Sequence, residues 1–174
     1  SFLSNIRLLG ESAEKTIISY GDYAALDSMG TFRTYTLKIT GNDITLENLT
    51  VENTAGKTAG QAVALHVEGD RFRAINCRII GNQDTLYAAG NNSRQFYGDC
   101  RIEGTTDFIF GSATAVFDGC VLHSKKNSYV TAANTPEGKS FGYVFRHCKL
   151  TADPGIDRVY LGRPWRDFAR VVYL

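Results

Sequence analysis

The chain has 174 residues, of which 19 are Lys or Arg and 18 are Asp or Glu, so its formal net charge is +1. This length can bury a substantial core, and one domain is the default expectation. The balanced charge gives no global basic field for nucleic acid or an anionic membrane, and no apolar run is long enough to span a bilayer. We therefore expect no nucleic-acid partner and no membrane association.

The two ends predict a piece of a longer protein. The only methionine is Met29, and residues 1–6 lack the basic start and apolar stretch of a signal peptide. Residues 171–174 have the character of the middle of a strand. We therefore expect a single domain over residues 1–174 that is truncated at both ends.

Five similar segments recur along the chain. They are residues 44–51, 72–79, 95–102, 115–122 and 143–150. Each alternates apolar and polar residues at period two and carries a small polar residue before a Leu or Cys, which is typical of strands. Leu49 and the four cysteines, Cys77, Cys100, Cys120 and Cys148, follow one another at intervals of 28, 23, 20 and 28 residues. Similarity at this period indicates stacked supersecondary units.

The repeat favours an all-β solenoid over a β-sandwich. Helical periodicity is almost absent, and Gly and Asn cluster between the units, where turns need positive φ. In a solenoid, each Cys or Leu would lie over the preceding one in a buried ladder. Four cysteines allow three disulfide pairings, and no Cys-x-x-Cys pair favours zinc, so we interpret them as buried structural thiols.

Four segments contain the candidate catalytic residues. They are Gln61-Ala62-Val63-Ala64-Leu65, Gly81-Asn82-Gln83-Asp84-Thr85-Leu86-Tyr87, Gly104-Thr105-Thr106-Asp107-Phe108-Ile109-Phe110-Gly111 and Tyr160-Leu161-Gly162-Arg163-Pro164-Trp165. Two carboxylates with different neighbours suit nucleophilic and acid–base catalysis, and neutral amides can stabilise an oxyanion. The set predicts acyl chemistry on an ester without serine, histidine or metal.

The spacing of these residues matches one coil. Asp84 and Asp107 are 23 residues apart, and Gln61 and Gln83 are 22 apart, so stacked coils would place each pair side by side. Structural alternatives remain for each: Asp84 as a turn residue, Asp107 with Arg163 as a structural ion pair, and the glutamines as a ladder of amides.

Histidines offer a weaker alternative. Ser112 follows Gly111, but no Gly-x-Ser-x-Gly elbow is present to support a serine triad with His66, His123 or His147. The histidines are too scattered to predict a metal site. We expect no cofactor and no metal.

The four motifs, in this order, resemble those of the pectin methylesterase (pectinesterase) family. Leu9-Gly10-Glu11-Ser12 and Lys15-Thr16-Ile17-Ile18 resemble the early region of that family, so the resemblance covers essentially the whole chain. It implies a right-handed parallel β-helix and hydrolysis of the methyl esters of homogalacturonan to methanol and pectate. A Gly-x-Tyr-x-Glu segment and the final coils of the family are missing, which predicts a partial catalytic domain.

The resemblance also implies roles for the site residues. Asp107 would be the nucleophile that forms an acyl-enzyme, with Arg163 keeping it ionised. Asp84 would be the general acid and then the general base, which requires a raised pKa. Gln61 and Gln83 would donate to the oxyanion. For substrate binding we predict Trp165, Phe110, Tyr87, Tyr129 and Thr106.

Other functions remain open at this stage. The main alternative is a non-catalytic β-helical module that binds polysaccharide, and a lyase or an inverting glycosidase could use the same architecture. A lyase would want an acidic calcium cluster that the sequence lacks, and a glycosidase would not need the glutamines. The family further implies a secreted protein that acts on pectin, and we expect a monomer.

Overall fold

The computed structural model describes residues 3–174 and contains almost only β-structure. Its strands are β1 (Ile6–Leu9), β2 (Ile17–Tyr20), β3 (Leu37–Ile39), β4 (Ile44–Glu47), β5 (Thr50–Asn53), β6 (Leu65–Val67), β7 (Phe72–Ile75), β8 (Arg78–Ile80), β9 (Leu86–Ala88), β10 (Arg94–Gly98), β11 (Arg101–Gly104), β12 (Ile109–Gly111), β13 (Thr114–Asp118), β14 (Val121–Ser124), β15 (Tyr129–Ala133), β16 (Tyr143–Arg146), β17 (Lys149–Ala152), β18 (Tyr160–Pro164) and β19 (Val171–Tyr173). Two 3₁₀ helices, η1 (Leu26–Ser28) and η2 (Thr31–Arg33), precede β3.

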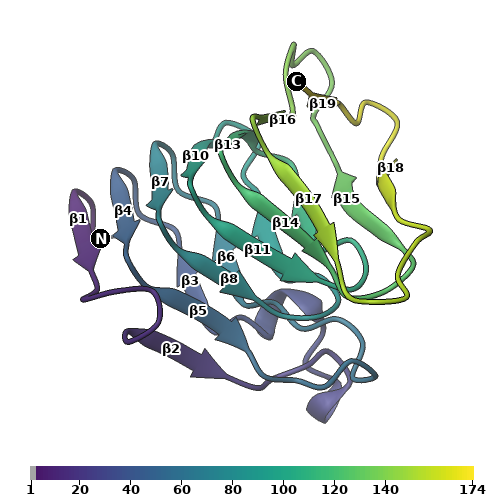
Figure 1. Ribbon diagram of the computed structural model, residues 1–174. Coiled ribbons are helices and arrows are strands. Elements are labelled where there is room, and N and C mark those ends of the chain that lie inside the picture. Colours follow the sequence, from purple (N-terminus) through teal and green to yellow (C-terminus); the bar gives the residue numbers. More distant parts are fainter. Residues whose placement is uncertain (1–2) are drawn as a thin grey trace.

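The strands form three parallel sheets that share the winding of the chain (Figure 1). Sheet A has the order β1-β4-β7-β10-β13-β16-β19, sheet B the order β17-β14-β11-β8-β5-β2, and sheet C the order β18-β15-β12-β9-β6-β3. Successive strands therefore pass from A to B to C, and each coil pairs with the next. This is a parallel β-helix, which confirms the prediction from the repeat.

Each repeated segment is a strand of sheet A, a sharp corner and a strand of sheet B. The corner residue has positive φ in every repeat: 55° at Asn48, 49° at Asn76, 52° at Asp99, 65° at Gly119 and 54° at His147. Asn, Asp and Gly adopt this region most readily, because their side chains are short or absent. The small polar residue before each Cys therefore bends the chain, which period-two alternation alone did not reveal.

The residue after the corner turns into the core and forms the predicted ladder. Backbone N–H groups one residue further on donate to the preceding rung, as from Arg101 to the Cys77 carbonyl (2.9 Å), Val121 to Cys100 (2.8 Å) and Lys149 to Cys120 (2.8 Å). The four thiols are free, and those of Cys77, Cys100 and Cys120 are buried. The interpretation as structural thiols is consistent with this arrangement.

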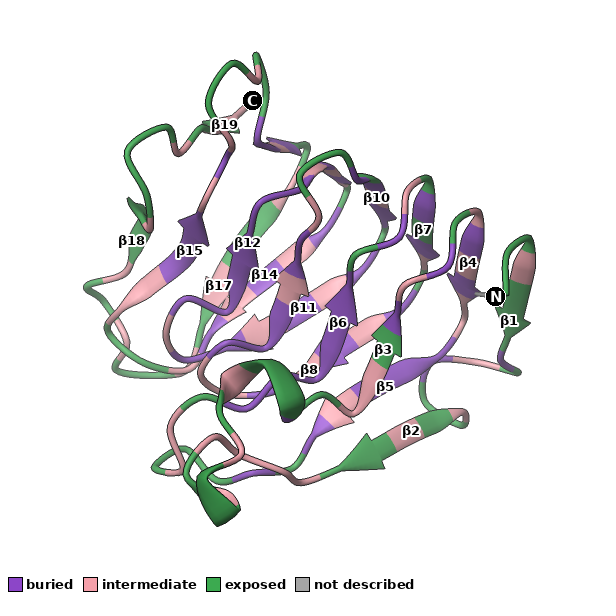
Figure 2. Ribbon diagram, turned by 180° about the vertical axis from the view of Figure 1, so that it is seen from behind, coloured by how far each residue is buried: buried purple, intermediate pink, exposed green. Residues whose placement is uncertain are grey.

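Aromatic side chains stack along the inner face of sheet A. The ring centroids of Tyr97 and Phe117 are 4.7 Å apart, those of Phe117 and Phe145 are 4.5 Å apart, and those of Phe145 and Tyr173 are 4.5 Å apart. The first three rings are fully buried within the coils, where Figure 2 shows the purple, buried segments of the strands. One ring per coil thus links neighbouring coils through the core.

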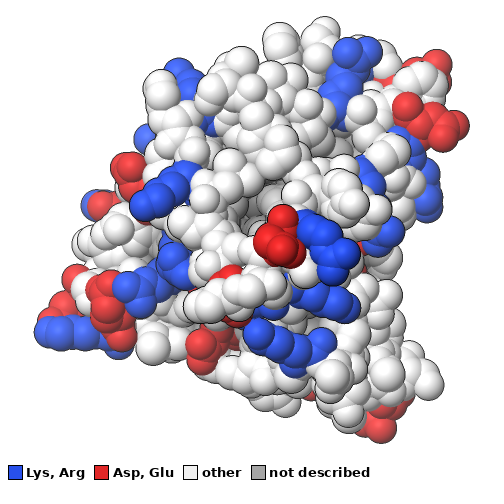
Figure 3. Space-filling view, turned by 45° about the vertical axis from the view of Figure 1, so that its right-hand side comes forward, with Lys and Arg blue, Asp and Glu red and all other residues white. Residues whose placement is uncertain are grey.

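Charged side chains occupy the outside of the coils in mixed pairs. The Arg146 guanidinium donates to Asp118 at 2.6 Å, and Arg71 and Arg94 both contact Asp70. On the face shown in Figure 3, basic and acidic side chains are interspersed. The surface therefore agrees with the near-neutral composition of the chain.

Candidate active site

Asp84 and Asp107 lie at the start of neighbouring strands of sheet C. Each precedes its strand in the left-handed region, with φ of 64° for Asp84 and 50° for Asp107. The Asp84 N–H donates to the Thr106 carbonyl at 3.1 Å, and the Asp107 N–H donates to the Tyr129 carbonyl at 2.8 Å. These bonds place the two aspartates one coil apart, as their spacing predicted. The backbone of Asp84 also lies in a turn, as the structural alternative for this residue predicted.

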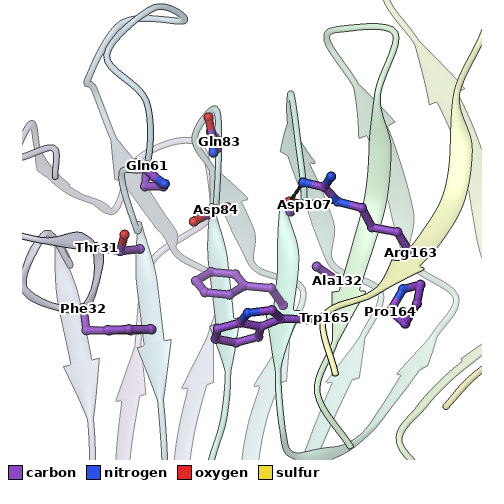
Figure 4. A pocket seen from close by; sticks show the side chains of 11 residues that line it. Thr31, Phe32, Gln61, Gln83, Asp84, Asp107, Ala132, Arg163, Pro164 and Trp165 are labelled. Atoms are coloured by element: carbon purple, nitrogen blue, oxygen red, sulfur yellow. Dashed lines mark hydrogen bonds and ion pairs between the residues drawn. The ribbon is translucent and has the colours of Figure 1, made fainter. Parts of the chain in front are cut away.

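Asp107 forms a bidentate ion pair with Arg163. The Arg163 Nε donates to Asp107 Oδ1 at 3.0 Å, and its Nη2 donates to Oδ2 at 2.6 Å. This hydrogen bonding raises the pKa of Arg163, with burial opposing it. Fork-to-fork pairing of this kind fixes the plane of the carboxylate as well as its charge. Figure 4 shows the Arg163 side chain reaching from β18 toward Asp107.

Asp84 is in the opposite electrostatic situation. Its side chain is buried, and within residues 3–174 its carboxyl group makes no hydrogen bond or ion pair. Burial, and then the charge of Asp107, raise the pKa of Asp84 to about 7, while Arg163 opposes the shift. The two neighbouring carboxyl groups thus differ in their electrostatic environment, one paired with a cation and one buried without a partner, which is the arrangement that separates an acid from a base.

Gln61 and Gln83 are held together by their backbones and not by their side chains. The two residues form a parallel β-bridge, and the Ala62 N–H donates to the Gln83 carbonyl at 3.0 Å. In the described part of the chain, neither side-chain amide has a hydrogen-bond partner. The amides therefore do not form the ladder considered as an alternative, and their N–H groups are available to a ligand.

These groups border one pocket of about 520 Å³. Its lining residues are Thr31, Phe32, Gln61, Gln83, Asp84, Asp107, Phe110, Ala132, Arg163, Pro164 and Trp165. In Figure 4 the glutamines and aspartates lie along one edge, and Phe32 and Trp165 lie below them. A polar edge opposite an aromatic one can orient a ligand that has both polar and apolar faces.

Aromatic contacts join the two walls of the pocket. The Phe110 ring lies 5.9 Å from Trp165 and 4.7 Å from Tyr87, and Phe32 lies 6.4 Å from Trp165, with interplanar angles of 53°, 34° and 23°. Phe32 belongs to η2 and was not predicted. It lies in no motif and no repeat, so the sequence carried no signal for it.

The predicted site residues divide into two groups. Gln61, Gln83, Asp84, Asp107, Phe110, Arg163 and Trp165 line the pocket. Tyr87, Tyr129 and Thr106 do not: Tyr87 packs beside Phe110, Tyr129 lies against the Arg163 guanidinium at 4.7 Å, and the Thr106 hydroxyl donates to Ser128 at 2.9 Å. A substrate-binding role for these three stays a prediction.

The three histidines lie outside the lining of this pocket. His66 Nε2 is 2.7 Å from Glu68, His123 Nε2 is 3.0 Å from Asp153, and His147 Nδ1 is 3.0 Å from Asp118. Among residues 3–174, no group of three or more His, Cys, Asp or Glu side chains is arranged to hold a metal ion. The described helices are also too short to cross a membrane.

Comparison with known proteins identifies the family. The sequence model of the Pectinesterase family matches residues 2–174. Pectinesterase 31 of Arabidopsis thaliana is 39% identical over 96% of this chain and 55% of its own length. Probable pectinesterase 56 of the same plant is 38% identical over 98% of this chain and 62% of its own length.

Comparison with solved structures indicates the same family. Pectin methylesterase PemA from Erwinia chrysanthemi superposes with a TM-score of 0.92 at 29% identity, over 99% of this chain and 64% of that protein. The enzyme from carrot superposes with a TM-score of 0.91 at 34% identity, over 98% of this chain and 56% of that protein. This chain therefore spans little more than half the length of the relatives described here, and it belongs to the pectinesterase family.

Proposed function

We propose that this chain forms the catalytic cleft of a pectin methylesterase, which hydrolyses the methyl esters of homogalacturonan to methanol and pectate. The observation that carries the proposal is the contrast between two adjacent carboxyl groups, one paired with Arg163 and the other buried without a partner. Family membership favours the same reaction. A related pectin methylesterase has been solved in complex with a hexasaccharide, which supports a polysaccharide ligand for this cleft.

In the proposed reaction, Asp107 is the nucleophile. Its ionised carboxylate attacks the ester carbonyl, and the resulting oxyanion accepts hydrogen bonds from the amides of Gln61 and Gln83. The intermediate collapses as the C–O bond to methoxide breaks and Asp84 gives its proton to the leaving oxygen. Methanol leaves, and an anhydride joins Asp107 to the sugar carboxyl.

The second half of the reaction regenerates the enzyme. The deprotonated Asp84 takes a proton from water, and the hydroxide attacks the anhydride at the sugar carboxyl. The bond to Asp107 breaks and releases the free carboxylate of the product. A carboxyl group with a pKa near 7 suits both steps, since it can give and take a proton at neutral pH.

The remaining lining residues would bind the polymer. Trp165 and Phe110 offer aromatic faces beside the carboxyl groups, and Phe32 offers a third from the other wall. Such faces pack against the apolar faces of sugars. Because the substrate is a polymer outside the cell, we expect the protein to be secreted.

Methanol release from highly methylated pectin tests the proposal, using the full-length protein that carries these residues. Asp107→Asn should abolish nearly all release, because a neutral amide cannot act as the nucleophile. Asn adopts positive φ as Asp does, so the backbone should not change. Asp157→Asn, an exposed residue outside the cleft, is the matched control and should keep full release. A folded wild-type protein that releases no methanol would instead favour a module that only binds polysaccharide.

A further inference from the structure

Arg163 has to cross an intervening coil to reach Asp107. Asp107 precedes β12, Arg163 lies in β18, and β15 runs between these two strands. Two strand spacings amount to about 10 Å, which an extended arginine side chain can span. The geometry of the Arg163–Asp107 ion pair thus depends on which side chain of β15 the guanidinium contacts as it crosses that strand.

Tyr129 is the side chain that occupies this position. The Arg163 guanidinium carbon lies 4.7 Å from the centre of the Tyr129 ring. A planar guanidinium stacks on an aromatic face, where it is attracted by the ring and loses freedom to rotate. The Tyr160 ring, one coil further on, stacks against Tyr129 at 5.2 Å with an interplanar angle of 26°. The tyrosine is therefore itself supported.

Tyr129 also contacts the other partner of the ion pair. Its backbone carbonyl accepts the Asp107 N–H at 2.8 Å, so one residue contacts both Asp107 and Arg163. The Arg163 side chain is 49% exposed, and the Asp107 side chain 11%. A half-exposed arginine on a long flexible chain would otherwise sample many rotamers and pair weakly.

We propose that Tyr129 is a positioning residue, whose ring holds Arg163 in the geometry that orients the Asp107 carboxylate for attack. This rests on the proposed function of Asp107 as the nucleophile. Tyr129 is not part of the pocket lining, and the guanidinium lies against its ring. Within residues 3–174 the Tyr129 hydroxyl makes no hydrogen bond, so the aromatic ring and not the hydroxyl positions the guanidinium.

Three variants of the full-length protein test this role by methanol release. Tyr129→Phe keeps the ring and should retain the wild-type kcat and KM. Tyr129→Leu should lower kcat by about tenfold or more while KM changes by less than about twofold, because the reacting group loses its orientation while the substrate contacts remain. Tyr20→Leu, which removes an exposed tyrosine of β2 that is not among the lining residues of the pocket, is the control and should change neither constant.

A double-mutant cycle shows whether Tyr129 acts through Arg163. In an Arg163→Lys background, Tyr129→Leu should cause little further loss of kcat, because lysine has no planar group to stack on the ring. Full additivity of the two losses would overturn the proposal. So would a rise in KM at constant kcat, which marks a direct sugar contact, or an equal loss in Tyr129→Phe and Tyr129→Leu.

A second measurement does not depend on activity and uses the same full-length protein. The Arg163 Nε–H resonance should be shielded by the ring in wild type and in Tyr129→Phe, and should lose that shielding in Tyr129→Leu. Should Tyr129→Leu fail to fold, Tyr129→Met replaces it in both experiments. An identical resonance in all variants would overturn the proposal. A wild-type protein without esterase activity would overturn the proposed function, and the NMR result would still decide where Arg163 is held.

Discussion

At the scale of single residues, Asp84 and Asp107 show how one side-chain type acquires two characters. They occupy equivalent places in neighbouring coils and share positive φ. They differ because Arg163 reaches only Asp107, which leaves Asp84 with burial and a neighbouring negative charge. The long side chain that reaches a carboxyl group therefore sets the electrostatic environment of that group, although both residues are aspartates.

The raised pKa of Asp84 predicts a pH-dependent cost to stability. Between the ordinary value of 3.8 and about 7, the folded state holds a proton that the unfolded state has released, so the free energy of unfolding falls as pH rises. Asp84→Asn cannot ionise and should escape this loss. Its stability relative to wild type should therefore increase by a few kcal/mol from pH 4 to pH 7 and stay constant above about pH 8.

Urea denaturation at a series of pH values measures this difference. Asp118→Asn is a control of opposite sign, because hydrogen bonding from Arg146 lowers the pKa of Asp118. The stabilisation by Asp118 is present at neutral pH and is lost as pH falls, so this variant should be most destabilised at neutral pH. A stability difference between Asp84→Asn and wild type that is constant from pH 4 to pH 8 would contradict the shift assigned to Asp84.

The site residues that could be predicted from the sequence are those that lie in motifs. Asp84, Asp107, Arg163, Gln61 and Gln83 were expected together. The aspartates and the glutamines border one pocket because each pair is spaced by one coil, whereas Arg163 reaches it from two coils beyond Asp107. Phe32 could not be expected, since the segment before β3 is irregular and its place opposite Trp165 is set by tertiary packing. The position of Tyr129 beneath Arg163 likewise depends on which strand lies between two others, which periodicity does not encode.

At the scale of elements, the sequence showed the repeated segments but did not show that each contains a sharp corner. The repeated segments were expected as strand units, and each is in fact two strands of different sheets. Alternation is interrupted at the corner: inward-facing side chains such as those of Phe117 and Cys120 lie three positions apart there, because the corner residue adds one position between the two strands. The conformation of that residue was visible only as a preference for Asn, Asp or Gly, which His147 does not follow.

Strand β18 depends on a glycine for its distance from β15. A Cβ added at Gly162 would overlap the Thr131 hydroxyl, which is buried and donates to the Leu161 carbonyl at 3.1 Å. Gly162→Ala should therefore push β18 away, cost about 1–3 kcal/mol of stability, and lower kcat by moving Arg163. Thermal denaturation and methanol release measure the two effects.

A second substitution provides the matched test of this packing. Thr131→Ala removes the hydroxyl that the new methyl group would meet, so the Gly162→Ala/Thr131→Ala double variant should be more stable than the sum of the single effects allows. Simple additivity of the two losses would show that the cost arises elsewhere in β18.

At the scale of the whole molecule, the proposed catalytic residues are brought together by the stacking of several coils and not by any single coil. Gln61, Gln83, Asp107 and Arg163 come from four of five successive coils, so the pocket exists only while those coils remain in register. In a solenoid each coil contacts only its neighbours, and stability is approximately a sum of coil and interface terms. The site therefore depends on the interfaces between coils.

The aromatic stack on the inner face of sheet A should report these interfaces. Phe117 is fully buried and stacks on Tyr97 on one side and Phe145 on the other. Phe117→Ala would leave a cavity at two interfaces at once, and it should cost about 3–5 kcal/mol. Phe141→Ala, at a ring that is 62% exposed, is the matched control and should change stability by less than about 0.5 kcal/mol.

Hydrogen exchange locates the loss. In Phe117→Ala, amide protection should fall most in β10, β13 and β16, which pair through the altered rung, and less in β1 and β4, which lie two or more coils away. The strands β12 and β15 of the candidate site belong to the same coils as β10 and β13, respectively. On heating, methanol release by Phe117→Ala should therefore fall over the same temperature range as the amide protection of β10 and β13. A uniform loss of protection over all coils would instead mean that the solenoid unfolds as one cooperative unit, and that no interface can open while the site stays formed.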